Sequence, residues 1–300
     1  MKISVALCFI LLILSGCVST PKKFSRAKYS AVDGEFTQPF ETHLTQVKGL
    51  PQKPYDSVCR QQVARENWWG LSTSDRTSSS AYLDGGVLLT AGHNFGDSLL
   101  GFSSASEFHL ECQTGYASSG NESLVYDNYQ KASSSLEYIH SDYSFTFAFL
   151  DKRFGRDAAL VKLCPLASVN KSAFRLASLS EINAFIQSAN AQLKPIIFVA
   201  GYPHGKSSPN APEAINGEFD GSRLMHVKTS AKQVSDAGVI RYSFSNTVSG
   251  MSGGPVWIEN DTPDGMEYVI IGVHVTNGGA FLIDKTIIEK YAQLREKSCQ

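Results

Sequence analysis

A glycine-rich hexapeptide near the end of the chain contains a serine that is suited to act as a nucleophile. Residues 250–255 have the sequence Gly-Met-Ser-Gly-Gly-Pro, with Ser252 at the centre. Glycine lets the backbone bend sharply and lets a substrate approach closely. The N–H groups of Gly250 and Ser252 can then point together at one carbonyl oxygen, as an oxyanion hole requires. The pattern predicts acyl transfer at Ser252.

Two upstream segments supply a general base and an acidic partner for it. Residues 88–93, Leu-Leu-Thr-Ala-Gly-His, place His93 after an apolar strand and a turn of small residues. A histidine held in this way can serve as a general base. Residues 156–163, Arg-Asp-Ala-Ala-Leu-Val-Lys-Leu, place Asp157 at the start of another apolar strand. Taken singly, each segment also fits a purely structural role.

Together, and in the order His, Asp, Ser, the three segments resemble those of the trypsin-like (chymotrypsin-fold) serine peptidases. Those enzymes carry Thr-Ala-Ala-His, Asp-Ile-Ala-Leu and Gly-Asp-Ser-Gly-Gly-Pro, whereas subtilisin-like and α/β-hydrolase enzymes have other orders. Asp157 lies 64 residues after His93 and 95 residues before Ser252, which leaves room for two successive barrels. The resemblance covers roughly residues 54–296. It implies a serine endopeptidase that acts on a protein or peptide through an acyl-enzyme, with no metal or organic cofactor.

The resemblance also implies a role for each residue of the site. His93 would take the proton of Ser252 and later return it to the leaving group, and Asp157 would hold the imidazole in the required tautomer. The N–H groups of Gly250 and Ser252 would stabilise the tetrahedral oxyanion, by about 3 kcal/mol for each donor.

Two further segments resemble the bacterial glutamyl-endopeptidase-like branch of this family. These are residues 201–203, Gly-Tyr-Pro, and residues 271–275, Ile-Gly-Val-His-Val. In that branch the second segment lines the primary specificity pocket, which implies substrate-binding roles for Gly272 and His274. Thr247, five residues before the serine, would help His274 to bind a substrate carboxylate. Relatives with other preferences carry the same histidine, so a purely lining role for His274 stays open.

The sequence departs from the animal enzymes at two positions beside the site. Met251 stands where those enzymes have the aspartate that pairs with a newly cut N-terminus, so activation through that ion pair is excluded. Asn94 follows the histidine, so the usual disulfide at that place is missing. Other acidic residues and a second histidine, His140 with Asp142 and also Asp151, lack the flanking patterns and are interpreted as loop residues.

The elements that must position these residues are predicted to be β-strands. Short apolar runs recur between turn signals at residues 80–83, 86–90, 108–112, 159–163, 196–200, 239–244, 255–258 and 268–275. Apolar residues at helical spacing predict a closing amphipathic helix over residues 284–295, and residues 176–193 have weaker helical character. We therefore expect an all-β fold of two antiparallel β-barrels of the chymotrypsin type with a C-terminal α-helix. The expected bounds are a first barrel at about 54–165, a connector at 166–194, a second barrel at 195–282, and the helix at 283–296 within a peptidase domain of residues 54–300.

The N-terminus has the features of a bacterial export signal. Lys2 is followed by an apolar run over residues 3–14, which is shorter than the roughly 20 residues that cross a bilayer. The run ends in Leu-Ser-Gly-Cys, which resembles the lipobox of bacterial lipoproteins and implies removal of residues 1–16 and lipidation of Cys17. Residues 17–53 would then be the lipid anchor and tether, and Val18 favours the outer membrane. An ordinary secretory signal with a chance cysteine is the alternative.

Composition restricts the possible partners. The chain of 300 residues has 27 Lys plus Arg against 28 Asp plus Glu, which argues against nucleic-acid binding. Four cysteines remain after the anchor, and export makes one or two disulfides plausible, with three pairings open. They are Cys59, Cys112, Cys164 and Cys299.

Three readings of the function differ in class. The first is an envelope-tethered endopeptidase that faces the periplasm or the cell surface. The second is a catalytically silent binding or scaffold lipoprotein, since a fold does not guarantee an activity. The third is an esterase that uses the same three residues.

Overall fold

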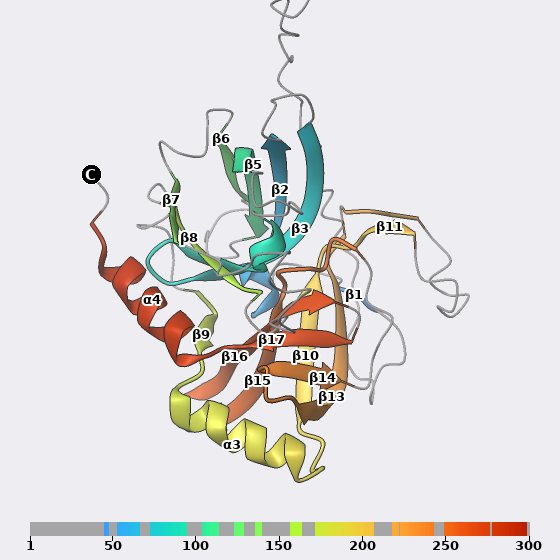
Figure 1. Ribbon diagram of the computed structural model, residues 1–300, viewed down its shortest axis with the longest axis vertical. Helices are drawn as coiled ribbons and strands as arrows, with labels where there is room; N and C mark the ends of the chain where they lie inside the picture. Colours follow the sequence, from blue (N-terminus) through green and yellow to red (C-terminus); the bar gives the residue numbers. More distant parts are fainter. Residues whose placement is uncertain are drawn as a thin grey trace, which may run out of the picture.

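Two large β-sheets and two α-helices make up most of the described part of the chain (Figure 1). The computed structural model describes residues 45–47, 53–66, 73–94, 104–113, 123–128, 136–139, 157–163, 172–206, 218–221, 223–242, 249–276 and 278–298. Each sheet is built from antiparallel neighbours, apart from one short parallel pairing. The prediction of an all-β, two-barrel fold with a C-terminal helix is confirmed.

The first sheet, which belongs to the first barrel, carries the strands that lead to His93 and Asp157. Its order is β6-β5-β2-β3-β4-β8-β7, and all pairs are antiparallel. The strands are β2 (Val58–Glu66), β3 (Thr73–Leu83), β4 (Val87–Thr90), β5 (Ser104–Gln113), β6 (Ser123–Asn128), β7 (Leu136–Ile139) and β8 (Ala159–Leu163). Every residue of β4 and β8 is buried, which explains their continuous apolar runs. Thr90 pairs with Ala159, so the end of β4 and the start of β8 lie at the same edge of the sheet.

A disulfide joins two neighbouring strands of this sheet. Cys59 of β2 lies directly opposite Cys112 of β5, and the two sulfur atoms are bonded. The expectation of a disulfide is thereby confirmed, with a pairing that the sequence left open. The bond spans 53 residues, a separation for which chain entropy gives a stabilisation of about 4 kcal/mol. Cys164 and Cys299 lie outside the described residues.

The second sheet closes into a six-stranded antiparallel barrel. Its path is β13-β10-β15-β16-β17-β14, and the pairing of β13 with β14 closes it. The strands are β10 (Ile196–Gly201), β13 (Met225–Val234), β14 (Val239–Tyr242), β15 (Pro255–Thr262), β16 (Gly265–Thr276) and β17 (Gly279–Leu282). β9 (Phe174–Leu176) lies parallel to β16, and β11 (His204–Lys206) pairs with β12 (Glu218–Asp220) beside the barrel.

A short strand from the N-terminal region is added to this barrel. β1 (Thr45–Gln46) pairs with Met225 and His226 at the start of β13, and Val47 N donates to Leu224 O at 2.9 Å. These residues belong to the segment 17–53, which is expected from the sequence to be the anchor and tether. Residues 45–47 of that segment are therefore held on the barrel.

Each of the two described α-helices begins at a capping residue of a type that commonly caps helices. α3 (Leu179–Asn190) begins with a capping box between Ser178 and Glu181, and it packs on β13. α4 (Lys285–Glu296) is capped by the Asp284 side chain, which accepts from Ile287 N at 2.9 Å. Figure 1 shows α4, in red, lying beside the first sheet, where it packs against β4 and β8. The chain therefore returns to the first barrel after it has built the second.

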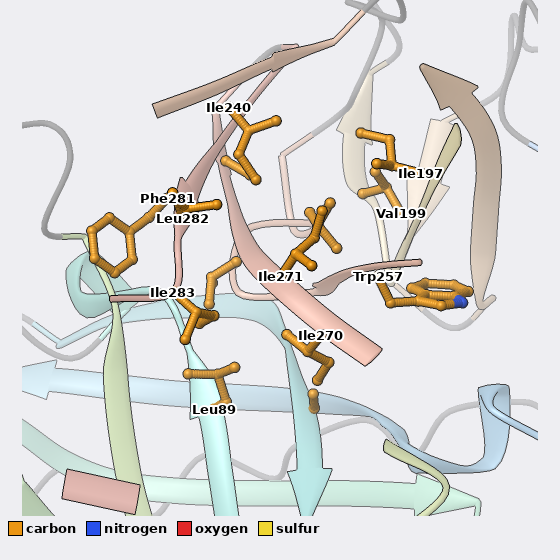
Figure 2. Close-up of a cluster of buried hydrophobic side chains, with 14 of the residues drawn as sticks. Leu89, Ile197, Val199, Ile240, Trp257, Ile270, Ile271, Phe281, Leu282 and Ile283 are labelled. Atoms are coloured by element: carbon orange, nitrogen blue, oxygen red, sulfur yellow. The ribbon is translucent and has the colours of Figure 1, made fainter. Parts of the chain in front are cut away.

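One continuous hydrophobic core joins the two barrels. Figure 2 shows Ile197, Val199 and Ile271 of the second barrel in a buried cluster that also includes Leu89 of the first. At one end of the cluster, the ring of Trp257 stacks on Phe198, with their centroids 5.4 Å apart. Because the barrels share a core, their relative position is set by packing, and residues at the edge of one barrel can be held accurately against the other.

Candidate active site

His93 and Asp157 meet at the edge of the first sheet. His93 lies in the 3-10 turn η2 (Gly92–Asn94) directly after β4, and Asp157 lies just before β8. The Asp157 carboxylate accepts from the backbone N–H of His93 at 2.9 Å and contacts the ring Nδ1 at 2.6 Å. A carboxylate only accepts hydrogen bonds, so the proton of a neutral ring lies on Nδ1 and Nε2 keeps its lone pair. The Asp157 side chain is 6% exposed and that of His93 is 17% exposed, so the His93 ring is in partial contact with solvent.

Ser252 lies in a tight turn of the second barrel that is fastened to the first. Its carbonyl oxygen accepts from Ser79 N at 2.9 Å and from the Asn94 side-chain amide at 3.1 Å. Asn94 is the residue after His93, so the serine segment and the histidine segment lie against each other. Residues that are far apart in the sequence, His93, Asp157 and Ser252, are thus brought together at the junction of the two barrels.

The glycines of this turn take conformations that other residues avoid. Gly250 and Gly253 both have φ of +91°. A Cβ atom on Gly250 would lie 2.5 Å from Tyr202 O and 2.6 Å from His204 N. Within the described ranges, neither the Gly250 nor the Ser252 N–H donates a backbone hydrogen bond.

Met251 fills a position in the hydrophobic core. Its side chain is fully buried and belongs to the same cluster as Val256 and Trp257. An aspartate at this place would need a buried cationic partner, whereas a methionine needs only apolar neighbours. Met251 therefore joins the serine turn to the hydrophobic core.

His274 of β16 lies behind the serine turn, and its side chain is buried. Its backbone pairs with the turn, because Gly253 N donates to His274 O at 2.7 Å and His274 N donates to Gly254 O at 2.9 Å. Its ring Nδ1 forms a short hydrogen bond with the Tyr242 hydroxyl. Because that hydroxyl donates its one proton to Gly279 O, the ring Nδ1–H is the donor to the Tyr242 oxygen. Burial, together with the nearby charge of His93, lowers the pKa of His274 to about 3. The ring is therefore neutral at physiological pH.

Of the two other predicted specificity residues, the structure describes one. Gly272 pairs with Val256 and Leu282 inside the barrel wall, and a Cβ atom there would lie 2.8 Å from Phe281 O. Thr247 lies outside the described residues. The same holds for the lipidation residue Cys17 and for the rejected candidates His140, Asp142 and Asp151.

Three residues beside the site were not identified from the sequence. Ser79 and Thr90 form hydrogen bonds around the serine turn, and Tyr242 bonds to His274. The run of polar residues at 77–80, inside a strand that continues as an apolar run, is a sequence signal that points to Ser79. The other two residues lie in strand sequences with no such irregularity.

Two buried histidines predict a loss of stability in mild acid. Burial lowers the pKa of His226 to about 4 and contributes most to the low pKa of His274. Below pH 6.5 the unfolded chain binds protons at both residues while the folded chain does not, so stability falls as the pH falls. Between pH 7 and pH 5 we expect each histidine to remove about 2 kcal/mol from the free energy of unfolding.

This expectation is measured by urea unfolding at both pH values. Replacing His226 by Gln removes one titrating group and should remove about half of the pH effect. A free energy of unfolding that stays constant from pH 7 to pH 5 contradicts the prediction.

The described residues contain no group of three or more His, Cys, Asp or Glu side chains placed to hold a metal ion. Among the same residues, no helix is long and apolar enough to cross a membrane. The sequence matches no protein-family model and no curated protein. The fold and the geometry of this site are therefore the basis for assigning a function.

Proposed function

We propose that the chain is a serine endopeptidase of the trypsin-like class, held at the bacterial envelope by a lipid on Cys17. The observation that carries the proposal is the contact of His93 with Asp157, with the Ser252 turn bonded to the next residue, Asn94. This arrangement unites a base, an acid that orients it and a nucleophile at one junction. The envelope location rests on the N-terminal sequence alone.

The chemistry follows from the protonation of His93. Nε2 takes the Ser252 proton while the serine oxygen attacks the substrate carbonyl, and Asp157 stabilises the imidazolium that forms. The N–H groups of Gly250 and Ser252 receive the negative charge on the carbonyl oxygen. His93 then protonates the leaving amine, which leaves an acyl group on Ser252. Water, deprotonated by His93, hydrolyses this ester and restores the serine.

A preference for acidic substrate residues would act through His274 and Thr247. Because the pKa of His274 is lowered to about 3, its ring would offer a substrate carboxylate no positive charge, and with the ring proton on Nδ1 bonded to Tyr242, Nε2 could only accept a hydrogen bond. An acceptor at Nε2 suits an amide or hydroxyl side chain, which can donate to it. We therefore propose amide and hydroxyl side chains, ahead of acidic ones, as the residues before the cleaved bond.

The proposal is tested by an active-site fluorophosphonate probe on the full-length protein purified in detergent. The activated Ser252 oxygen displaces fluoride from phosphorus, so the wild type should become labelled and Ser252→Ala should not. Ser180→Ala, at an exposed position on α3, is the matched control and should label like the wild type.

Hydrolysis of a labelled protein substrate and of a simple ester then separates the possible activities. Cleavage of the protein substrate, lost in Ser252→Ala, supports the endopeptidase. Hydrolysis of the ester alone would instead indicate an esterase. Absence of labelling in the wild type would contradict both and would favour a binding lipoprotein.

A further inference from the structure

The proposed site is divided between the two barrels, which raises the question of what aligns its halves. His93 and Asp157 belong to the first barrel, whereas Ser252 and the oxyanion donors belong to the second. Reacting groups misplaced by about 1 Å can lose about a hundredfold in rate. The bonds that cross from the first barrel to the 250–252 segment therefore bear directly on the reaction.

Ser79 of β3 makes two such bonds and a third bond to Tyr202, which also belongs to the second barrel. Its hydroxyl donates to Gly250 O at 2.8 Å and accepts from Tyr202 N at 2.8 Å, while its backbone N–H donates to Ser252 O at 2.9 Å. A serine hydroxyl has one proton, so the two neighbours fix its direction. The hydroxyl holds the peptide that follows Gly250, and the main chain holds the carbonyl of the nucleophile. Both contacts are buried and depend on one residue of the first barrel.

Asn94 completes the connection from the histidine side. Its side-chain amide donates one hydrogen to Ser252 O at 3.1 Å and the other to Thr90 Oγ1 at 2.9 Å. Thr90 Oγ1 donates its own proton to Ser79 O at 2.7 Å, so it can only accept from Asn94. This network fixes the orientation of the amide. It also closes a chain of bonds between Ser79 and Asn94 behind the nucleophile.

We infer that Ser79 and Asn94 are positioning residues that set Ser252 and the Gly250 peptide in register with His93 across the barrel junction. The inference rests on the proposed function. Asn94 stands where the animal enzymes have the cysteine of a disulfide, so here a hydrogen bond to the nucleophile segment occupies that place. Neither residue touches the substrate, and each acts through the placement of the 250–252 segment.

Ser79 and Ser80 provide a matched pair for the test. Both are fully buried on β3, but the Ser80 hydroxyl has no hydrogen-bond partner among the described residues. Ser79→Ala removes the link to Gly250 O and Tyr202 N, whereas Ser80→Ala removes a hydroxyl that bonds to nothing described. The two variants thus lose the same atom from adjacent buried positions and differ in the contact across the junction.

The experiment measures the second-order rate of fluorophosphonate labelling per folded molecule, well below the unfolding temperature of each variant. We expect Ser79→Ala to label about tenfold to a hundredfold more slowly than the wild type. Ser80→Ala should stay within about twofold. With a peptide substrate, the loss should appear in kcat with KM unchanged, and the affinity for a boronic acid that mimics the tetrahedral intermediate should fall in parallel. A purely structural role would lower the folded fraction and leave these quantities unchanged.

Asn94→Asp is the second variant, because it keeps the shape of the side chain and replaces its two donated hydrogens by oxygen lone pairs. It should lower kcat in the same way, so the test survives if Ser79→Ala fails to fold. Wild-type labelling with unchanged rates in both folded variants overturns the inference and leaves the proposed function intact. Absence of labelling in the wild type overturns both.

Discussion

Replacement of Asp157 by Asn should lower kcat about ten-thousandfold while the protein stays folded. The carboxylate accepts two hydrogen bonds from the same residue, one from His93 N and one from Nδ1. An asparagine has one oxygen and one NH2 group, so only one of these bonds survives. If the oxygen keeps the backbone N–H, the NH2 group faces Nδ1 and forces the ring proton onto Nε2. The base then carries a proton on the nitrogen that must accept one. If the amide is turned, its NH2 group opposes the backbone N–H of His93.

The measurement is kcat for a peptide substrate, with Asp56→Asn as the control. Asp56 is also a buried carboxylate, but its hydrogen-bond partner is the Ser57 hydroxyl. Its replacement should leave kcat close to that of the wild type. Comparable activity in Asp157→Asn and the wild type would show that His93 does not depend on this carboxylate, and the proposed mechanism would be rejected.

The residues of the candidate site could be found in the sequence because each belongs to a short local pattern. His93 follows an apolar run, Asp157 begins another, and Ser252 lies among glycines whose φ values of +91° the turn requires. The α4 helix could be predicted for the same reason, since its apolar spacing and the Asp284 cap are local features. Local patterns of this kind survive in a sequence even when the partners are distant.

Other elements could not be predicted from the sequence, because contacts with distant residues rather than their own local pattern determine their structure. β2 contains Arg60, Gln61 and Gln62, which look like exposed residues but are buried. Gln61 is bonded to Ser78 and Thr90, so its burial depends on polar partners from neighbouring strands. A polar strand of this kind shows no clear alternation of apolar and polar residues from which it could be predicted. The contacts of Ser79 and Asn94 with the serine turn were unpredictable for the same reason, because they join residues about 160 positions apart or more.

Replacement of Gly253 by Ala should destabilise the protein by about 4 kcal/mol or more and should abolish labelling of Ser252. A Cβ atom on Gly253 would lie 2.1 Å from both Ser79 O and Thr90 Oγ1, and 2.8 Å from the Asn94 amide. Ser79 O is a backbone atom in the middle of a strand, so it cannot move without separating the turn from the first barrel. The positive φ adds a strain of about 1 to 2 kcal/mol for any residue with a side chain.

Gly238→Ala separates these two costs. Gly238 also has a positive φ, +71°, but no atom lies within 4 Å of the position that a Cβ atom would take there. This variant should lose only the strain of about 1 to 2 kcal/mol and should label like the wild type. Chemical unfolding of the two variants therefore measures the close approach at Gly253 by difference. Equal losses in the free energy of unfolding would mean that the serine turn is not closely packed against the first barrel. A much larger loss at Gly253 would mean that the position of Ser252 depends on that contact.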